Sequence, residues 1–333
     1  MRYKQLIQTL MYTTLAIATT FSWAQATHES SAKTSGDVVD TIEEQNVKPD
    51  VLDKSRDYIG DSYVSLAEKL DIFIARKPRD RNYNNSALSV LVSATNFEGS
   101  EAAHDISIRS KLDLPGTKDR FQLFLETDPD ESDTLANANR PVSTGERITR
   151  QDAVAGIEFS TKEQLARWRH SVSLGGKLND GIDLLVRYRL RKSWQLPNRW
   201  MSQVRQDFWY QDGIGWGETS HLKFARPIAD KYLFDVVTQF RAEDSDDPYE
   251  YANVWRLDHR FRDSWNVTYK FGLLGESDGG TMLDDFFINF SLGYRLKRNW
   301  VYVFLTPEIF YAEESRHKPE RSLTLSFELL FTD

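Results

Sequence analysis

Hydrophobic and polar residues alternate along most of the chain from residue 86 to its end. Residues 323–331 alternate Leu and Phe with Thr, Ser and Glu, and residues 286–294 repeat the same two-residue period. Because successive side chains of a strand point to opposite faces, this period predicts strands with one apolar and one polar face. The runs lie near 86–98, 104–115, 120–128, 150–161, 165–175, 183–193, 200–211, 217–227, 231–242, 249–261, 265–275, 283–296, 300–313 and 320–332.

The connections between these runs also alternate. One set is short, as at Pro115-Gly116 and Pro197-Asn198, and the other is mostly longer and acidic, at 129–149, 176–182, 243–248, 276–282 and 314–319. Strands of about ten residues, joined by short turns at one end and longer loops at the other, are typical of a membrane-spanning β-barrel. We predict an all-β, antiparallel transmembrane barrel over 86–333, with about fourteen strands and twelve to sixteen as alternatives.

The first residues predict a targeting signal. Arg2 and Lys4 precede a mostly apolar run, Leu6–Ala18, and Ala24-Gln25-Ala26 forms a small-x-small cleavage site. This order predicts a signal peptide over 1–26 and export of the rest of the chain. A membrane anchor is the alternative, but Gln8 and several Thr residues interrupt the apolar run.

Residues 27–85 form the predicted periplasmic N-terminal segment. Its first half is polar and acidic, whereas Ile59, Tyr63, Leu66, Leu70 and Phe73 recur at three- and four-residue spacing. This spacing predicts one amphipathic helix near 61–77 that ends before Pro78. The helix either packs on the barrel, enters it as a plug, or binds a periplasmic partner.

Composition excludes several classes of protein. The 333 residues carry a net charge of −8, no cysteine and a mean hydropathy of −0.54. The lack of cysteine excludes disulfides, thiolate metal sites and an acylated cysteine. The low hydropathy excludes a bundle of membrane helices, and the acidic balance argues against nucleic-acid binding. No phosphate-binding or dinucleotide-binding glycine motif is present, so we expect no cofactor and no metal.

Tryptophan positions agree with a barrel in lipid. Several lie at or just after short turns, and others lie toward the longer loops. Two rings of amphipathic aromatic side chains are expected where a barrel crosses the two lipid interfaces. The predicted girdle residues are Trp168, Trp200, Trp265 and Trp300 near the turns, and Trp209 and Trp255 toward the loops.

The chain resembles Gram-negative outer-membrane β-barrel proteins, in particular poorly characterised proteobacterial members. The resemblance covers 86–333 and is most specific in the last strand, where Phe327, Leu329 and Phe331 match the spacing of the signal that the barrel-assembly machinery reads. Members of this class usually end on the aromatic residue, whereas here Thr332 and Asp333 follow Phe331. The resemblance implies an outer-membrane location, with lipid, lipopolysaccharide and the assembly machinery as partners.

Alternation assigns many charged side chains to the lumen. Because Arg or Lys facing lipid near the midplane costs about 2–4 kcal/mol, the charged face is expected inside. The predicted basic lining is Arg167, Arg169, Arg187, Arg189, Arg191, Arg205, Arg256 and Arg260, and the acidic lining is Glu158, Asp207, Asp235, Asp258, Glu308 and Glu328.

Two functions follow from this interior. Charges spaced around water would make a passive pore for small, anionic solutes. A lattice of paired charges would instead close the lumen and leave a structural or assembly scaffold of the outer membrane. The clustering of Arg187, Arg189 and Arg191 favours the pore.

A lipid-modifying enzyme is the third alternative. A His–Ser pair on one face of a strand needs an even separation, yet His170 and Ser171 are adjacent, as are Ser220 and His221. Each pair therefore points to opposite faces. A triad assembled from several strands would need the tertiary structure to reveal it. We expect no catalytic residue.

Overall fold

The fold was analysed in a computed structural model. The structure describes residues 86–99, 101–114, 120–127, 134–140, 153–161, 167–178, 182–244, 249–277, 284–297 and 300–332. All of them belong to the larger of two units into which the chain divides, Pro49–Asp333. The predicted signal peptide (1–26) and the predicted helix near 61–77 lie outside the described residues. Among the described residues, no helix is long and apolar enough to cross a membrane.

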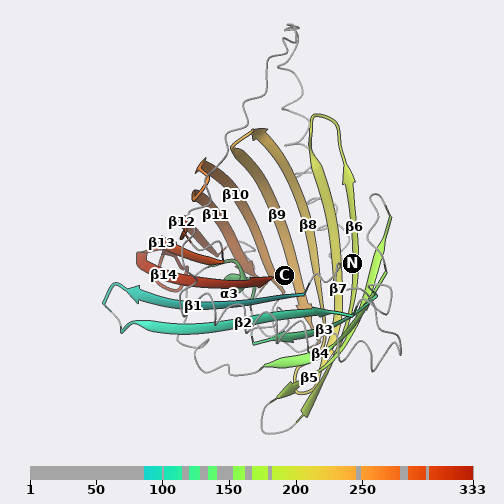
Figure 1. Ribbon diagram of the computed structural model, residues 1–333. Coiled ribbons are helices and arrows are strands. Elements are labelled where there is room, and N and C mark those ends of the chain that lie inside the picture. Colours follow the sequence, from blue (N-terminus) through green and yellow to red (C-terminus); the bar gives the residue numbers. More distant parts are fainter. Residues whose placement is uncertain are drawn as a thin grey trace, which may run out of the picture. The chain divides into compact units, whose positions relative to one another are not determined.

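Fourteen antiparallel strands form a closed barrel in which each strand pairs with its sequence neighbours and β1 pairs with β14 (Figure 1). This confirms the predicted architecture and strand number. The strands are β1 (Ala87–Phe97), β2 (Ala103–Asp113), β3 (Phe121–Glu126), β4 (Val154–Ser160), β5 (Arg169–Leu178), β6 (Ile182–Gln195), β7 (Met201–Gln211), β8 (Gly215–Ala229), β9 (Tyr232–Glu243), β10 (Glu250–Arg262), β11 (Trp265–Glu276), β12 (Asp285–Arg295), β13 (Val301–Tyr311) and β14 (Pro319–Thr332).

The two faces of the sheet differ as the alternation predicts. One face carries the ion pairs, and the opposite face carries the exposed apolar side chains of the strands. Those apolar residues include Val92, Ile106, Val172, Leu174, Phe208, Tyr269, Phe271, Ile288, Phe290, Leu305, Leu323, Leu325 and Phe327. Such a band can stay exposed only against lipid, because contiguous apolar surface in water favours association. The charged face is therefore the inner face.

The two ends of the barrel differ in their connections. At one end, here called the turn end, Asp230-Lys231 joins β8 to β9 and Asp263-Ser264 joins β10 to β11. At the other, the loop end, the long connection 127–153 joins β3 to β4. The predicted long loop at 176–182 is wrong, because β5 runs to Leu178 and β6 begins at Ile182. Gly176, which begins the predicted loop, lies within β5.

A short helix interrupts the long connection. Helix α3 (Leu135–Asn139) begins after Thr134, whose hydroxyl accepts a hydrogen bond from the backbone N–H of Asn137. The helix contacts β10 and β11, which lie across the ring of strands from β3 and β4. Helix α3 therefore lies on the inner face of the wall opposite β3 and β4.

Candidate functional site

The inner face of β5–β8 carries a row of basic side chains. The strand register places Arg169 beside Arg191, and Arg191 beside Arg205. On the next strand the row continues with His221, which is paired with Arg205. Directly paired like charges repel, so a row of this kind raises the electrostatic potential of the wall. The register places no carboxylate between Arg169 and His221 in this row.

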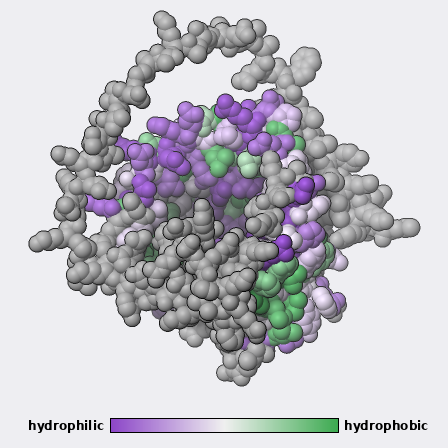
Figure 2. All heavy atoms as spheres, turned by 45° about the vertical axis from the view of Figure 1, so that its right-hand side comes forward, coloured by the Kyte–Doolittle hydropathy of each residue, from purple (hydrophilic) through white to green (hydrophobic). Residues whose placement is uncertain are grey.

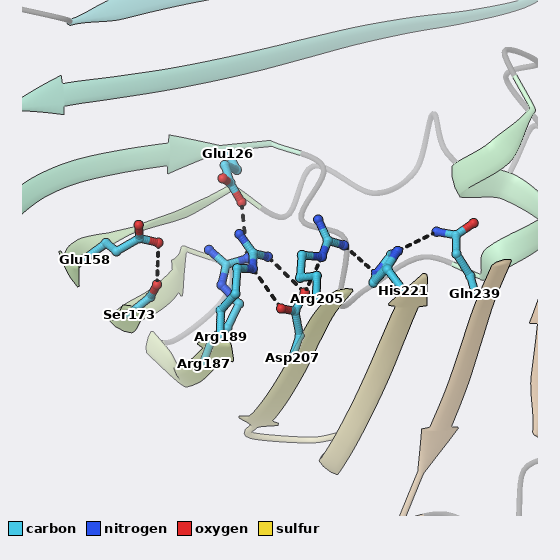
Figure 3. A network of polar contacts seen from close by, with 9 residues as sticks. All are labelled: Glu126, Glu158, Ser173, Arg187, Arg189, Arg205, Asp207, His221 and Gln239. Carbon is cyan, nitrogen blue, oxygen red and sulfur yellow. Dashed lines mark hydrogen bonds and ion pairs between the residues drawn. The ribbon is translucent and has the colours of Figure 1, made fainter. Parts of the chain in front are cut away.

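Asp207 is the centre of the ion pairs above this row (Figure 3). Its two carboxylate oxygens accept hydrogen bonds from Arg189 at 2.8 and 3.1 Å. Arg205 reaches the same carboxylate at 3.2 Å. Two guanidiniums thus share one buried carboxylate, so this part of the wall keeps a positive surplus.

Arg187 lies deeper in the wall and is held between aromatic rings and a carboxylate. Its guanidinium is 3.8 Å from Glu126 and 5.6 Å from the centre of the Phe124 ring. Glu158 accepts a hydrogen bond from Ser173 at 3.0 Å on the neighbouring strands. These contacts orient Arg187 and Glu158 on the wall.

The adjoining wall, which continues from β8 to β11, is more balanced in charge. Asp235 accepts from Arg256 at 2.8 Å and lies 3.7 Å from the ammonium of Lys223. Asp258 lies 3.4 Å from Arg256 and accepts a hydrogen bond from Thr268. The two walls therefore differ, and the asymmetry creates a field across the lumen.

Helix α3 is fixed to the inner face of β10–β13 by one apolar and several polar contacts. Leu135 packs into a buried cluster on the inner face, formed by Ala252, Val254, Leu274, Phe287 and Phe310. The carboxylate of Glu250 accepts a hydrogen bond from the backbone N–H of Leu135. Arg140, just after the helix, donates to Glu308 at 2.8 Å and stacks over the Phe310 ring at 3.6 Å. The helix therefore narrows the lumen from the loop end.

Water-accessible space remains inside the barrel. A cavity of about 980 Å³ opens near the turn end, and its lining includes Asp258, Arg260, Arg295, Tyr302 and Glu328. A smaller cavity of about 360 Å³ lies beside α3 and is lined by several carboxylates, including Glu250 and Glu276. Figure 2 shows a hollow whose visible described walls are mostly hydrophilic. No group of His, Asp or Glu within the described residues is arranged to hold a metal ion.

The structure brings the predicted lining residues to one face. Thirteen of the fourteen lie in strands at registers that face inward, and Arg167 precedes β5 and is exposed. The inward residues are Arg169, Arg187, Arg189, Arg191, Arg205, Arg256, Arg260, Glu158, Asp207, Asp235, Asp258, Glu308 and Glu328. Their role in solute passage stays a prediction.

The predicted girdle requires one correction. Trp209 is 1% exposed and lies on the inner face, where it covers Gly217 and stacks under Arg241 at 5.6 Å. The prediction that Trp209 lies at the lipid interface is wrong, because Trp209 shares the inward-facing alternate positions of β7 with Arg205 and Asp207.

The other predicted tryptophans lie outside the lumen. Trp200 packs on Phe234 at 6.4 Å between ring centres, Trp265 on Tyr294 at 4.4 Å, and Trp255 on Phe271 at 5.4 Å. Trp300 packs on Phe331 at 5.6 Å, and Trp168 is 48% exposed beside β5. Phe327, Leu329 and Phe331 share the outer face of β14. A role at the lipid interface or in barrel assembly stays a prediction for each.

Sequence reasoning missed aromatic pairs at the loop end. Tyr210 packs on Trp216, Phe240 on Tyr249, and Phe286 on Tyr311, with ring centres 5.2, 5.7 and 4.4 Å apart. Tryptophan positions alone do not reveal these tyrosines and phenylalanines. Their alternation with polar residues was the available signal.

In each histidine–serine pair considered for a lipid-modifying enzyme, the two side chains point to opposite faces of the sheet, as expected. Nδ1 of His170 lies 2.8 Å from the hydroxyl of Tyr188 on the outer face, while Ser171 is buried on the inner face. Ser220 donates a hydrogen bond to Gln206, and His221 faces the lumen beside Arg205. Neither adjacent pair can act as a nucleophile and its base.

No protein-family model matches the chain, and no curated protein matches it in sequence. Solved structures of outer-membrane barrels are similar in fold. The outer membrane channel DcaP of Acinetobacter baumannii is 9% identical, with a TM-score of 0.42, covering 74% of this chain and 97% of that one. A loop-deletion mutant of OmpT, an outer membrane protein of Vibrio cholerae, is 6% identical, with a TM-score of 0.46, covering 75% and 100%. The NanC porin is 9% identical, with a TM-score of 0.39, covering 73% and 98%.

The fold is that of an outer-membrane β-barrel. This conclusion depends on the closed ring of fourteen strands and on the apolar outer band, which together place the chain in the outer membrane. The similarities to solved structures concern the fold and leave the solute undetermined.

Proposed function

We propose that this barrel is a passive pore for small anionic solutes. The observation that carries the proposal is the row of Arg169, Arg191 and Arg205 on three adjacent strands. A low-dielectric wall concentrates the field of such a row, so anions accumulate beside it and cations are excluded. The polar cavity at the turn end supplies space for a hydrated solute.

Helix α3 supports a pore with a size limit. Because Leu135 and Arg140 are fixed to the wall opposite the arginines, a solute passing the helix is directed toward the basic wall. Charged groups across a narrow lumen act over a few ångströms, where salt screens them least. The second wall is charge-balanced, so selectivity is expected to depend on the first.

The test is the reversal potential of single channels in a planar bilayer under a KCl gradient. Replacing Arg169 and Arg191 with Gln removes two charges from the row, and we expect the Cl⁻-to-K⁺ permeability ratio to fall toward unity. Arg321→Gln is the matched control, because Arg321 lies on β14 with a 63% exposed side chain and faces outward. A reversal potential that Arg169→Gln/Arg191→Gln leaves unchanged would contradict the proposal.

A non-conducting scaffold is the second candidate. The paired charges around Asp207, Asp235 and Glu308, together with α3 inside the barrel, are what a closed lumen would need. Under this function the folded protein shows no conductance in the same bilayer, whatever the ionic gradient.

A further inference from the structure

His221 extends the arginine row by one strand and is part of its hydrogen-bond network (Figure 3). Nη2 of Arg205 contacts Nε2 of the ring, and the side-chain amide of Gln239 lies 3.1 Å from Nδ1. A guanidinium can only donate hydrogen bonds, so the bond from Arg205 requires a lone pair on Nε2. The Gln239 atom beside Nδ1 is its amide nitrogen, which is also only a donor. An imidazolium could accept neither contact and a neutral ring can accept one, so the imidazole is neutral in the arrangement that the structure shows.

The orientation of this ring is fixed from its far side. The side-chain oxygen of Gln239 accepts a hydrogen bond of 2.7 Å from Asn139 at the end of α3. Asn139 also donates to the carbonyl of Leu135 within the helix, at 2.8 Å. The amide of Gln239 is thus held in place by α3, with its nitrogen 3.1 Å from Nδ1 of His221.

We propose that His221 sets the anion selectivity of the pore according to pH. The inference rests on the proposed pore and goes beyond it by naming a specificity-determining residue. Protonation places a hydrogen on Nε2, where it faces the guanidinium of Arg205. The hydrogen bond is then lost, two cations stand side by side, and Arg205 turns toward solute. The row gains a fourth positive charge.

The charged groups near His221 come from three strands. On β7 they are Arg205 and its partner Asp207; on β8, Lys223 lies two residues further along the same face; and on β9, Arg241 lies two residues from Gln239. The arginines and the lysine keep their charge between about pH 5 and 8, and histidine is the side chain whose ordinary pKa lies in that range. Asp207 is bound to two arginines. The change in charge of this group of residues therefore comes from His221.

The experiment measures the reversal potential of the full chain under a KCl gradient, with chloride as the probe anion, at about pH 7.5 and about pH 5. We expect the Cl⁻-to-K⁺ permeability ratio of the natural protein to rise at least about twofold at the lower pH. His221→Gln, which cannot gain the charge, should keep its high-pH ratio at both values. His259→Gln is the matched control, because His259 stacks on Tyr232 at 4.3 Å on the outer face, and it should respond like the natural protein.

If His221→Gln disturbs the packing of the wall, a second variant still tests the role of His221. His221→Lys is charged at both pH values, so it should show the acid-type selectivity already at about pH 7.5. An equal pH response in His221→Gln and the natural protein would overturn the role of His221 and leave the pore intact. A folded barrel without conductance would overturn the pore proposal itself, together with this inference.

Discussion

The contact between Arg140 and Glu308 gives the sharpest test of how α3 is held. Glu308 has a fully buried side chain whose Oε1 accepts a hydrogen bond from Nε of Arg140 and also lies 2.8 Å from its Nη2. Asn289 donates to the other oxygen at 2.9 Å. Glu308→Gln keeps the shape and removes the charge. An uncompensated buried charge of this kind costs about 3–5 kcal/mol if Arg140 stays in place.

The other contacts that hold α3 contribute free energies of similar magnitude to this penalty. Burial of Leu135 contributes about 1.5–3 kcal/mol, and the hydrogen bond of Asn139 to Gln239 about 0.5–1.5 kcal/mol. The hydrogen bond from the N–H of Leu135 to the Glu250 carboxylate adds about 1.5–3 kcal/mol. Because Arg140 belongs to a connection, it escapes the penalty by leaving the wall with α3. We therefore expect the helix to undock for a substantial fraction of the time.

The assay is single-channel recording together with thermal unfolding of the same preparation. Undocking of α3 widens the lumen, so Glu308→Gln should show larger and noisier conductance steps while the barrel unfolds near its normal midpoint. Glu98→Gln is the control: Glu98 pairs with Arg321 at 3.3 Å on the surface, where such pairs contribute about 0–1 kcal/mol. Unchanged conductance steps in a folded Glu308→Gln barrel would refute the reasoning.

Two further predictions concern the barrel itself. A Cβ at Gly217 would lie 2.1 Å from Cζ2 of Trp209, so Gly217→Ala should lower the free energy of unfolding by about 1–3 kcal/mol in urea titrations. In a Trp209→Leu background, Gly217→Ala should cost little of the free energy of unfolding, because the clash is gone. If the effects of the two substitutions on that free energy simply add, the contact between Gly217 and Trp209 is not the cause. Leu325 is 39% exposed in the middle of the outer face of β14, so Leu325→Arg should destabilise the barrel in lipid vesicles by about 2–4 kcal/mol. Leu325→Met is the control, and equal stability of the two variants would mean that this face does not contact lipid.

Much of the barrel is determined locally, and the sequence therefore predicts it. Each strand needs only its own two-residue period to separate an apolar face from a polar one, as in β14. Since a shift of one residue would expose a whole set of charges to lipid, the register of each strand is fixed by the same pattern. For this reason the inward positions of Arg187, Arg189 and Arg191 follow from the sequence.

Exceptions arise where a residue's neighbours come from other strands. The inward-facing ring of Trp209 fits because Gly217 on the next strand leaves space for it. Gly175 lies in a strand, where an added Cβ would approach Phe124 of β3 to 3.1 Å. The period of β7 alone gives the inward direction of Trp209, because it shares the face of Arg205 and Asp207. The space left by each glycine depends on which residues the closed sheet brings together.

The path of the connection between β3 and β4 was decided by the tertiary structure alone. Its sequence is polar and acidic and predicts an external loop. Leu135 and Arg140 nevertheless contact Phe310 and Glu308 on the opposite wall. Only barrel closure brings that wall within reach of the connection. The sequence by itself determined the strands, their faces and the charge of the lumen, because these depend on local alternation. The narrowing by α3 depends on contacts with a wall on the far side of the ring, which exist only once the ring has closed. The link between Arg205 and His221 depends on the pairing of β7 with β8.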